Sequence, residues 1–328
     1  MTKKQVGPTS RRTSTMLNRA KKDLKLFALD YDGTLVASGS DLYTIDSAKS
    51  CMQEIINHFA SLVIISARAA TGYQILVPVL QKLLQPVDRS PHVYFAGGNG
   101  TMMYRIFPKK TERIYCHNIP LEIVQQIIQE VNRIYKEEHI EANKLNSNGL
   151  RMFLQMKAQS WDKIINPQVL SASRPYPWCF AEDVKISIVL PQTIKQHSAL
   201  LDKLVQIIKN LEQTHDIHLQ ISRGDETFAH ITRSFEGKDP KLAALEHVMA
   251  ELVLNDNQVV VIGDMPDGND KGILVDSDFP YTFTNSQKHQ IPQGVFLSKP
   301  YPLLDRYSDQ QLHPIETVYR AIHFLLTR

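Results

Sequence analysis

Short apolar segments that end in a polar residue or a glycine mark three buried strands, two near the start of the chain and one near its end. Residues 24–30 are mostly apolar up to Asp30, residues 62–65 precede Ser66, and residues 259–262 precede Gly263. A nearly continuous apolar run, without alternation, is typical of a strand that is covered on both faces, as in a parallel sheet.

Amphipathic helices are predicted between these strands. Apolar residues share one helical face in residues 46–59, where Asp46 is the predicted N-cap, and another helix is predicted at residues 69–84. A third helix is predicted at residues 242–254, preceded by Asp239 as N-cap and Pro240 in the first turn. Strand and helix alternate at both ends of the chain, so the predicted fold class is α/β with a doubly wound parallel sheet.

The middle of the chain has a different pattern. Long amphipathic helices are predicted at residues 121–135 and 198–211, and strands at residues 101–107, 150–156, 184–190 and 217–222. This mixture is typical of an inserted α+β domain with a largely antiparallel sheet. We therefore predict a core of residues 23–103 and 229–328 that is interrupted by an inserted domain at residues 104–228.

Charge changes this picture only at the N-terminus. The 328 residues carry a net charge of +3, and residues 1–22 contain seven lysines and arginines and no acid, which leaves −4 for the remainder. We predict that this basic leader is a disordered tail, with a transit peptide or a nucleic-acid-binding arm as alternatives. No basic helix or aromatic strand of a nucleic-acid-binding kind follows, so no nucleic-acid partner is expected.

Cysteine usage and hydropathy indicate the compartment. Cys51, Cys116 and Cys179 are far apart and lack the spacing of a zinc site, which favours a reducing compartment, the cytoplasm. No segment approaches the ~18 consecutive apolar residues of a membrane span, so no membrane association is expected. The oligomeric state stays open.

Two acidic loops carry the candidate chemistry. In DYDGTL, residues 30–35, Asp30 and Asp32 come at the end of a strand, where a doubly wound sheet opens its ligand crevice. In GDMPDGND, residues 263–270, Asp264, Asp267 and Asp270 follow another strand. Each loop alone has a structural explanation as a turn. Close carboxylates repel one another, however, so acids at two strand ends predict a divalent cation, with Mg²⁺ favoured.

Other polar residues fit an anionic substrate. Ser66 directly precedes a helix, so its hydroxyl and nearby backbone N–H groups can hold a phosphate oxygen. Lys238 precedes the predicted 242–254 helix, and Lys241 lies in its first turn. Taken singly, each of these side chains is as well explained by a solvated surface.

In this order, the motifs resemble those of the haloacid dehalogenase (HAD) superfamily of phosphohydrolases. DYDGTL is similar to motif I, ISAR at residues 65–68 to motif II, a lysine at 238 or 241 to motif III, and GDMPDGND to motif IV. The insertion between motifs II and III resembles a C2-type α/β cap. GGNGT at residues 97–101 resembles the hinge of Cof-like and sucrose-phosphatase-like members, and the tyrosine of DYDGTL resembles trehalose-phosphate phosphatases.

The resemblance implies a Mg²⁺-dependent phosphatase, a phosphoric monoester hydrolase, that acts on a small phosphorylated metabolite, with a sugar phosphate favoured. It implies that Asp30 is the nucleophile that forms an aspartyl-phosphate and that Asp32 is the general acid and base. The implied phosphate-binding residues are Ser66 and Lys238 or Lys241, and the implied metal ligands are Asp30, Asp32, Asp264 and Asp270.

Departures from the family pattern leave alternatives open. Motif IV is two residues longer than GDxxND, as in eukaryotic phosphomannomutases. Asp267 therefore competes with Asp270 as a metal ligand, and a phosphomutase stays an alternative.

Two lysines compete for motif III. Lys241 fits the Cof-like spacing of motif III and Lys238 fits a Gly-Lys-Pro form; because Lys238 lies outside the helix, we favour it. A non-enzymatic binding protein is a third possibility, although such proteins have typically lost one acid. Nucleotide and lipid-phosphate substrates also stay open.

Several residues are weaker candidates, each with a structural explanation beside the functional one. Arg68 is the next candidate for the cation that faces the phosphate, and His215 and His218 are expected at the surface. Candidate substrate contacts are Asn99, Trp161, Trp178, Arg223 and His230.

Overall fold

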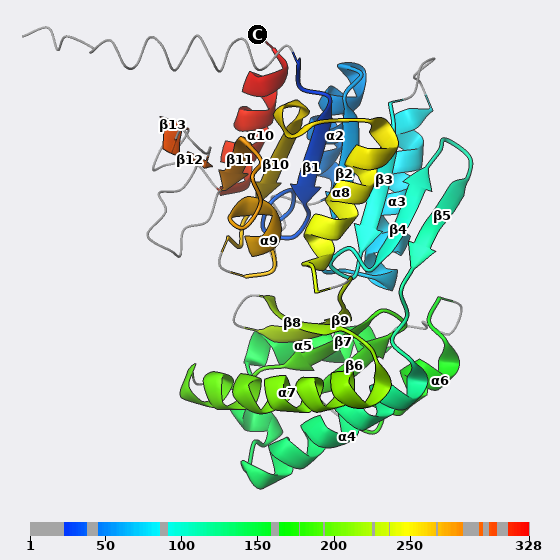
Figure 1. Cartoon of the computed structure of the whole chain (residues 1–328), viewed down its shortest axis with the longest axis vertical. Coiled ribbons are helices and arrows are strands. Elements are labelled where there is room, and N and C mark those ends of the chain that lie inside the picture. Colours follow the sequence, from blue (N-terminus) through cyan, green and yellow to red (C-terminus); the bar gives the residue numbers. More distant parts are fainter. Residues whose placement is uncertain are drawn as a thin grey trace, which may run out of the picture.

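The computed structural model of the protein describes residues 23–37, 45–85, 91–158, 164–176, 178–192, 194–224, 227–235, 237–266, 268–284, 295–297, 302–306 and 314–327. In these residues the chain forms two parts, a core and a cap, stacked along the long axis of the molecule (Figure 1). The predicted leader at residues 1–22, Trp161 and Asp267 lie outside the described residues.

Among the described residues, nine strands form one sheet, the core sheet. They are β1 (Leu26–Asp30), β2 (Ser61–Ile65), β3 (Val93–Gly97), β4 (Met102–Ile106), β5 (Thr111–Cys116), β10 (Val259–Gly263), β11 (Tyr281–Thr284), β12 (Val295–Leu297) and β13 (Pro302–Arg306). Their order is β13-β12-β11-β10-β1-β2-β3-β4-β5. The strands from β11 to β3 run parallel, and those at both edges pair antiparallel.

Helices cover both faces of the core sheet, which explains why its central strands are apolar at nearly every position. Phe27 and Leu29 of β1 pack with α2 (Ile45–Asn57), α3 (Ala70–Leu84) and α10 (Pro314–Leu326). Leu26 and Ala28 point the other way, toward α8 (Pro240–Leu252) and the short α9 (Lys271–Leu274). Figure 1 shows α8 in front of the sheet and α2 behind it. The prediction of a doubly wound α/β core is confirmed.

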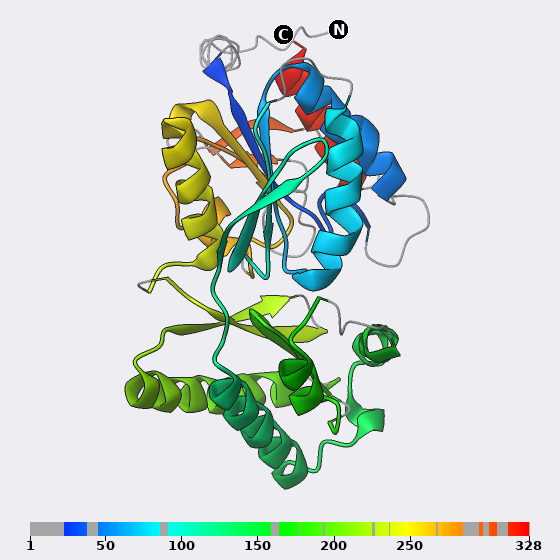
Figure 2. The ribbon, with the colours of Figure 1, turned by 90° about the vertical axis from the view of Figure 1, so that its right-hand side faces the viewer.

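The cap is an antiparallel sheet with helices on one side. Its strands, in the described residues, have the order β6-β7-β9-β8 and are β6 (Cys179–Glu182), β7 (Lys185–Val189), β8 (Leu219–Gly224) and β9 (Phe228–Arg233). Its helices are α4 (Leu121–Glu137), α5 (Ser147–Ala158), α6 (Pro167–Ser173) and α7 (Ile194–His215). Helices α4 and α7 lie on the side of the sheet remote from the core, and the sheet itself faces the core (Figure 2). The 3₁₀ turns are η2 (Ala142–Lys144) and η3 (Asp256–Gln258).

The boundaries of the cap differ from the predicted residues 104–228. Strands β4 and β5 extend the core sheet, because Val93 of β3 pairs with Ile106 and the hairpin continues from there. Strand β9 pairs with β7 and so belongs to the cap, which lies between β5 and α8. An antiparallel hairpin at the edge of a parallel sheet has one exposed face, so its alternation resembles that of the inserted domain.

Two local predictions are wrong. Residues 150–156 were expected to form a strand but lie within α5, because a short apolar run fits both periods and its surroundings decide between them. Asp46 is in the first turn of α2 rather than at its N-cap, where its charge still favours the helix N-terminus.

None of the helices in the described part of the chain combines the length and the hydropathy needed to cross a membrane. Cys51, Cys116 and Cys179 are all free thiols.

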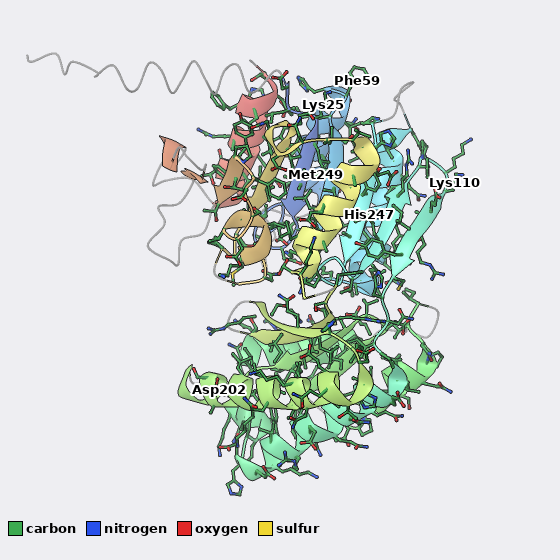
Figure 3. All side chains as sticks on the ribbon, in the orientation of Figure 1. Lys25, Phe59, Lys110, Asp202, His247 and Met249 are labelled. Atoms are coloured by element: carbon green, nitrogen blue, oxygen red, sulfur yellow. The ribbon has the colours of Figure 1, made fainter. Side chains whose placement is uncertain are left out.

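Two core helices are followed by bulky residues in the left-handed conformation. Phe59 comes after α2 with φ of 58°, and Val253 closes α8 with φ of 54°. Figure 3 shows Phe59 at the end of the core remote from the cap. Phe59 is 67% exposed and Val253 88% exposed. The packing of these two side chains therefore offsets little of the free-energy cost of the strained backbone.

We expect Val253→Gly to raise the free energy of unfolding by about 0.5–1 kcal/mol, because glycine adopts positive φ without strain and the exposed valine loses few contacts. Urea denaturation measures the change. As a control, Val205→Gly in the interior of α7 should lower the stability by about 1 kcal/mol. Destabilisation by both changes would show that the Val253 side chain stabilises the end of α8.

Candidate active site

The C-terminal ends of β1, β2 and β10 lie side by side at the edge of the core sheet that faces the cap (Figure 1). The parallel register places the buried Asp30 beside Ile65, so Ser66 follows at the same edge. Asp264 follows Gly263 at the end of β10, on the other side of β1. Residues predicted from separate motifs therefore come together here.

A tight turn after β1 brings the two acidic loops into contact. The chain turns at Gly33, whose φ is +82°, and both Leu35 and Val36 donate backbone hydrogen bonds to the carbonyl of Tyr31. A Cβ atom at position 33 would lie 2.2 Å from Asp264 Oδ2. The backbone conformation therefore favours glycine at position 33, and a larger residue would also have to displace the Asp264 carboxylate.

Lys241 is the cation at the centre of this cluster. Its Nζ lies 2.6 Å from Asp30 Oδ1 and 2.5 Å from Asp270 Oδ1, and the side chain is 0% exposed. Asp239 caps α8 as predicted, because its carboxylate accepts hydrogen bonds from the backbone N–H groups of Lys241 and Leu242 at 2.9 and 3.1 Å. This cap fixes the first helical turn, from which Lys241 extends into the site.

The structure does not bring Lys238, the lysine favoured from the sequence, to this cluster, because its side chain lies on the surface with its Nζ 3.0 Å from Glu246 Oε2. The sequence contains a signal that favours Lys241. It occupies the same helical face as the buried Ala244, Leu245 and Val248, which follow at spacings of three, four and seven residues. Lys241 therefore points toward the sheet for the same reason as the apolar residues of α8.

The carboxylates of the cluster carry more charge than one lysine balances. Burial, followed by the charge of Asp270, raises the pKa of Asp30 to about 8. Burial, then Asp30 and Asp270, raises the pKa of Asp264 well above its usual value. Burial opposes the charge on Lys241, but the attraction of Asp270 and Asp30 outweighs it and raises the pKa of the ammonium group.

A divalent cation fits this arrangement. One ligand atom from each of Asp30, Asp264 and Asp270 lies within 4.8 Å of the others. Carboxylate oxygens are the ligands that Mg²⁺ prefers, and the single ammonium group of Lys241 does not balance three ionised carboxylates. The geometry is therefore compatible with the predicted metal.

Asp270 differs from the other two acids in that both of its oxygens have partners. Oδ1 accepts from Lys241, and Oδ2 accepts from the backbone N–H groups of Asp264 and Met265 at 3.1 and 3.0 Å. A Cβ atom on Gly263 would lie 2.6 Å from Asp270 Oδ2. Asp270 thus holds the loop after β10 in place and pairs with Lys241.

Asp32 forms a two-bond ion pair with Arg68, which the sequence did not predict. Arg68 Nε donates to Asp32 Oδ2 at 2.7 Å, and Nη2 donates to Oδ1 at 2.6 Å. The guanidinium also lies 5.4 Å from the centre of the Tyr31 ring. Burial opposes the charge of Arg68, but Asp32 raises its pKa above the usual value. The two residues are 36 positions apart, so no local pattern connects them.

Ser66 lies at the site as predicted. It is fully buried, and its Oγ accepts a hydrogen bond from the backbone N–H of Arg68 at 3.0 Å. Its carbonyl accepts from the backbone N–H of Asn99 at 2.8 Å. Asn99 has a positive φ of 58°, and its side chain donates to Ser222 Oγ of the cap at 2.9 Å. The turn that contains Asn99 therefore contacts both the core site and the cap.

His230 lies on the core-facing side of the cap sheet. Its neighbours Ala229 and Ile231 belong to the cap interior, so His230 points the opposite way. Its Nδ1 lies 3.2 Å from Ser187 Oγ. Burial, then the charges of Lys185 and Lys241, lowers the pKa of His230 well below its usual value. The imidazole is therefore neutral at physiological pH.

Other candidate contacts lie elsewhere. Trp178 packs on Tyr135 with ring centroids 5.0 Å apart, inside the cap. Arg223 is exposed at the end of β8, and its carbonyl lies close to Gly268 of the loop after β10. His218 is exposed, as expected, whereas the His215 side chain is only 20% exposed, with its Nδ1 3.7 Å from Glu122 Oε1.

The family model for haloacid dehalogenase-like hydrolases matches residues 27–291. The chain belongs to this family. The match includes both acidic loops, the cap and the first turn of α8, so the predicted superfamily is confirmed, and with it the prediction that this HAD-like hydrolase is an enzyme. No curated protein matches the sequence.

The solved structures that are similar to this chain are distant in sequence. An HAD/COF-like hydrolase from Plasmodium vivax is 20% identical over 83% of this chain and 89% of its own, with a TM-score of 0.50. A hydrolase from Bacteroides thetaiotaomicron is 18% identical over 74% and 82%, with a TM-score of 0.44. An IMP-bound IMP-nucleotidase from Plasmodium falciparum is 14% identical over 80% of this chain, with a TM-score of 0.45. The present chain spans only 63% of the length of that nucleotidase.

The contact between Gly33 and Asp264 can be tested by a matched pair of glycines. Gly33→Ala should lower the free energy of unfolding by about 2–3 kcal/mol, because the new Cβ has a strained φ and displaces Asp264. Gly237→Ala has a similar φ of +77° with no atom within 4 Å of the new Cβ, so it should cost only about 1 kcal/mol. Equal losses in urea denaturation would show that the turn and Asp264 are not in tight contact.

Proposed function

We propose that this HAD-like hydrolase is a Mg²⁺-dependent phosphatase that hydrolyses a small phosphorylated metabolite, a sugar phosphate, through an aspartyl-phosphate on Asp30. The observation that carries the proposal is the buried cluster of Asp30, Asp264 and Asp270 around Lys241 at the end of β1. Such a cluster suits an anionic substrate and a divalent cation together, and it suits neither an apolar nor a cationic ligand.

We assign Asp30, Asp264 and the backbone carbonyl of Asp32 as metal ligands. Asp270 is already engaged by Lys241 and two backbone N–H groups, so we assign it to positioning rather than to direct coordination. When bound, Mg²⁺ supplies positive charge that reduces the repulsion between the Asp30 carboxylate and the phosphoryl group.

Asp30 attacks first. A carboxylate oxygen of Asp30 forms a bond to phosphorus, the ester P–O bond breaks, and the leaving oxygen takes a proton from Asp32. Lys241 and the Ser66 hydroxyl stabilise the negative charge on the oxygens of the transferring phosphoryl group. In the second step Asp32 takes a proton from water, whose oxygen attacks phosphorus and releases Asp30 and inorganic phosphate.

The ion pair between Arg68 and Asp32 gives Arg68 a role in these reaction steps. While both oxygens of Asp32 accept hydrogen bonds from Arg68, neither oxygen is free to exchange a proton with the substrate or with water. A phosphoryl group offers the guanidinium an alternative two-bond partner. Substrate entry thus draws Arg68 away from Asp32 and leaves the Asp32 oxygens free for proton transfer.

The cap supports the choice of a polyhydroxylated leaving group. Besides the Glu182–Lys185 ion pair, its core-facing side presents uncharged hydrogen-bonding groups at the Ser222–Asn99 contact and the Ser187–His230 contact. Hydroxyl groups of a sugar match such partners, and a site built from them rejects analogues that lack the hydroxyls. The cap sheet also lies over the end of β1 (Figure 1), so it limits the access of bulk water to the site while the one water molecule of the second step can still react. The free cysteines are consistent with the predicted cytoplasmic location.

The decisive experiment is release of phosphate from a panel of sugar phosphates, nucleotides and lipid phosphates, with Mg²⁺ or with EDTA. We expect hydrolysis of one or more sugar phosphates only with Mg²⁺, and a loss of several orders of magnitude in Asp30→Asn, because an amide is a poor nucleophile. Full activity in EDTA, or in Asp30→Asn, would contradict the proposal. Phosphoryl transfer to a sugar with a bisphosphate requirement would instead identify a mutase.

The two lysines give a second test. Lys241→Met should lower kcat/KM about a hundredfold or more, because it removes a buried charge-assisted contact with Asp30 and the phosphoryl group. Lys238→Met removes an exposed ion pair with Glu246 and should cost less than about threefold. Steady-state kinetics with the best substrate of the panel decide the matter, and a larger loss in Lys238→Met would overturn the assignment.

A further inference from the structure

Helix α3, which follows motif II, has no N-terminal cap of its own. Its N-cap residue is Ala69, whose side chain cannot accept a hydrogen bond. Instead, the first backbone N–H of the helix, that of Ala70, donates to Glu182 Oε1 at 2.9 Å. Glu182 belongs to β6 of the cap, so a cap carboxylate supplies the negative charge that the N-terminus of this core helix favours.

A lysine of the cap binds the same turn. Lys185 Nζ donates to the carbonyl oxygen of Ala67 at 2.7 Å and lies 3.2 Å from Glu182 Oε2. The two residues pair across β6 and β7, and their side chains are 5% and 2% exposed. A buried ion pair of the cap thus contacts the motif II turn at two points, Ala67 and Ala70.

The contact of Lys185 with the Ala67 carbonyl matters because the peptide between Ala67 and Arg68 also binds the Ser66 hydroxyl. The carbonyl of Ala67 and the N–H of Arg68 belong to one rigid peptide plane. Lys185 binds the oxygen of this plane, and its N–H donates to the Ser66 hydroxyl at 3.0 Å. The orientation of the plane therefore sets the orientation of the hydroxyl that we assign to phosphate binding.

The neighbouring peptides of the turn are held by the core. The carbonyl of Ser66 accepts from the N–H of Asn99 at 2.8 Å, and that of Arg68 accepts from the N–H of Gly98 at 3.1 Å. Between them, the carbonyl of Ala67 is bound by the cap lysine. Hydrogen bonds from both the core and the cap therefore fix the turn.

We propose that Glu182 and Lys185 are positioning residues for phosphoryl transfer. They hold the Ala67–Arg68 peptide and the start of α3 so that the Ser66 hydroxyl faces the phosphoryl group, and they do so only when the cap is seated on the core. The phosphate-binding part of the site is therefore completed by the cap, which otherwise contacts the leaving group. The inference rests on the proposed phosphatase function.

The test compares Lys185→Met in two backgrounds, with p-nitrophenyl phosphate and Mg²⁺. In the otherwise unchanged protein, kcat/KM should fall about tenfold or more, and inhibition by inorganic phosphate should weaken in parallel. In the Ser66→Ala background, the same change should cost less than about twofold, because the hydroxyl that it positions is already absent. The control is Lys203→Met, which removes an exposed cap ion pair with Glu138 and should have no effect in either background.

An equal loss in both backgrounds, or a loss below about threefold in the first, would overturn the proposal, since a general effect on the cap would be additive. If Lys185→Met fails to fold because Glu182 is left charged and unpaired, the neutral double variant Glu182→Gln/Lys185→Met takes its place in both backgrounds.

Amide hydrogen exchange separates this inference from the proposed function. We expect Lys185→Met to speed exchange in residues 66–72 more than about tenfold while the strands of the core sheet stay protected. Absence of Mg²⁺-dependent hydrolysis in the unchanged protein would refute the phosphatase proposal, and exchange would then decide alone whether the cap orders the turn. Unchanged exchange in residues 66–72 would refute the positioning role.

Discussion

The ion cluster of Lys241 with Asp30 and Asp270 is the constraint on which the core depends. Burying one of these charges alone would be costly, so each requires the others to be in place. That requirement fixes the start of α8, the end of β1 and the loop after β10 relative to one another. One lysine does not balance all three acids, and the raised pKa values of Asp30 and Asp264 mean that a further cation would stabilise their charged forms. An interaction needed for folding therefore also prepares the site for a cation.

The cap contributes through the polar face of its sheet. Its apolar side chains pack against α4 and α7 on one side, which leaves the other side free for hydrogen bonds to the core. Those bonds end on the Asn99 turn, on Asp239 and on the motif II turn. Each of these points is adjacent to a residue of the candidate site, so the position of the cap and the geometry of the site depend on each other.

Much of the arrangement could be predicted because the signals are local. The apolar runs before Asp30 and Ser66, the capped start of α8 at Asp239 and the order of the acidic loops follow from periodicity, helix caps and turn chemistry. The same reasoning failed where two structures share a pattern. Residues 150–156 fit a strand and a helix equally, and the β4–β5 hairpin resembles the inserted domain until its pairing with β3 is known.

The sequence by itself determined the α/β core, the family motifs and the acids that reach one edge of a parallel sheet, since neighbouring residues are enough to define them. Only the tertiary structure decided that Lys241 rather than Lys238 enters the site, that Arg68 pairs with Asp32, and that Glu182 and Lys185 contact the motif II turn. The Lys241 contacts depend on the rotation of α8, and the others join residues from 36 to 118 positions apart. No short-range pattern encodes the contacts of Arg68, Glu182 and Lys185, because they exist only after the elements have packed.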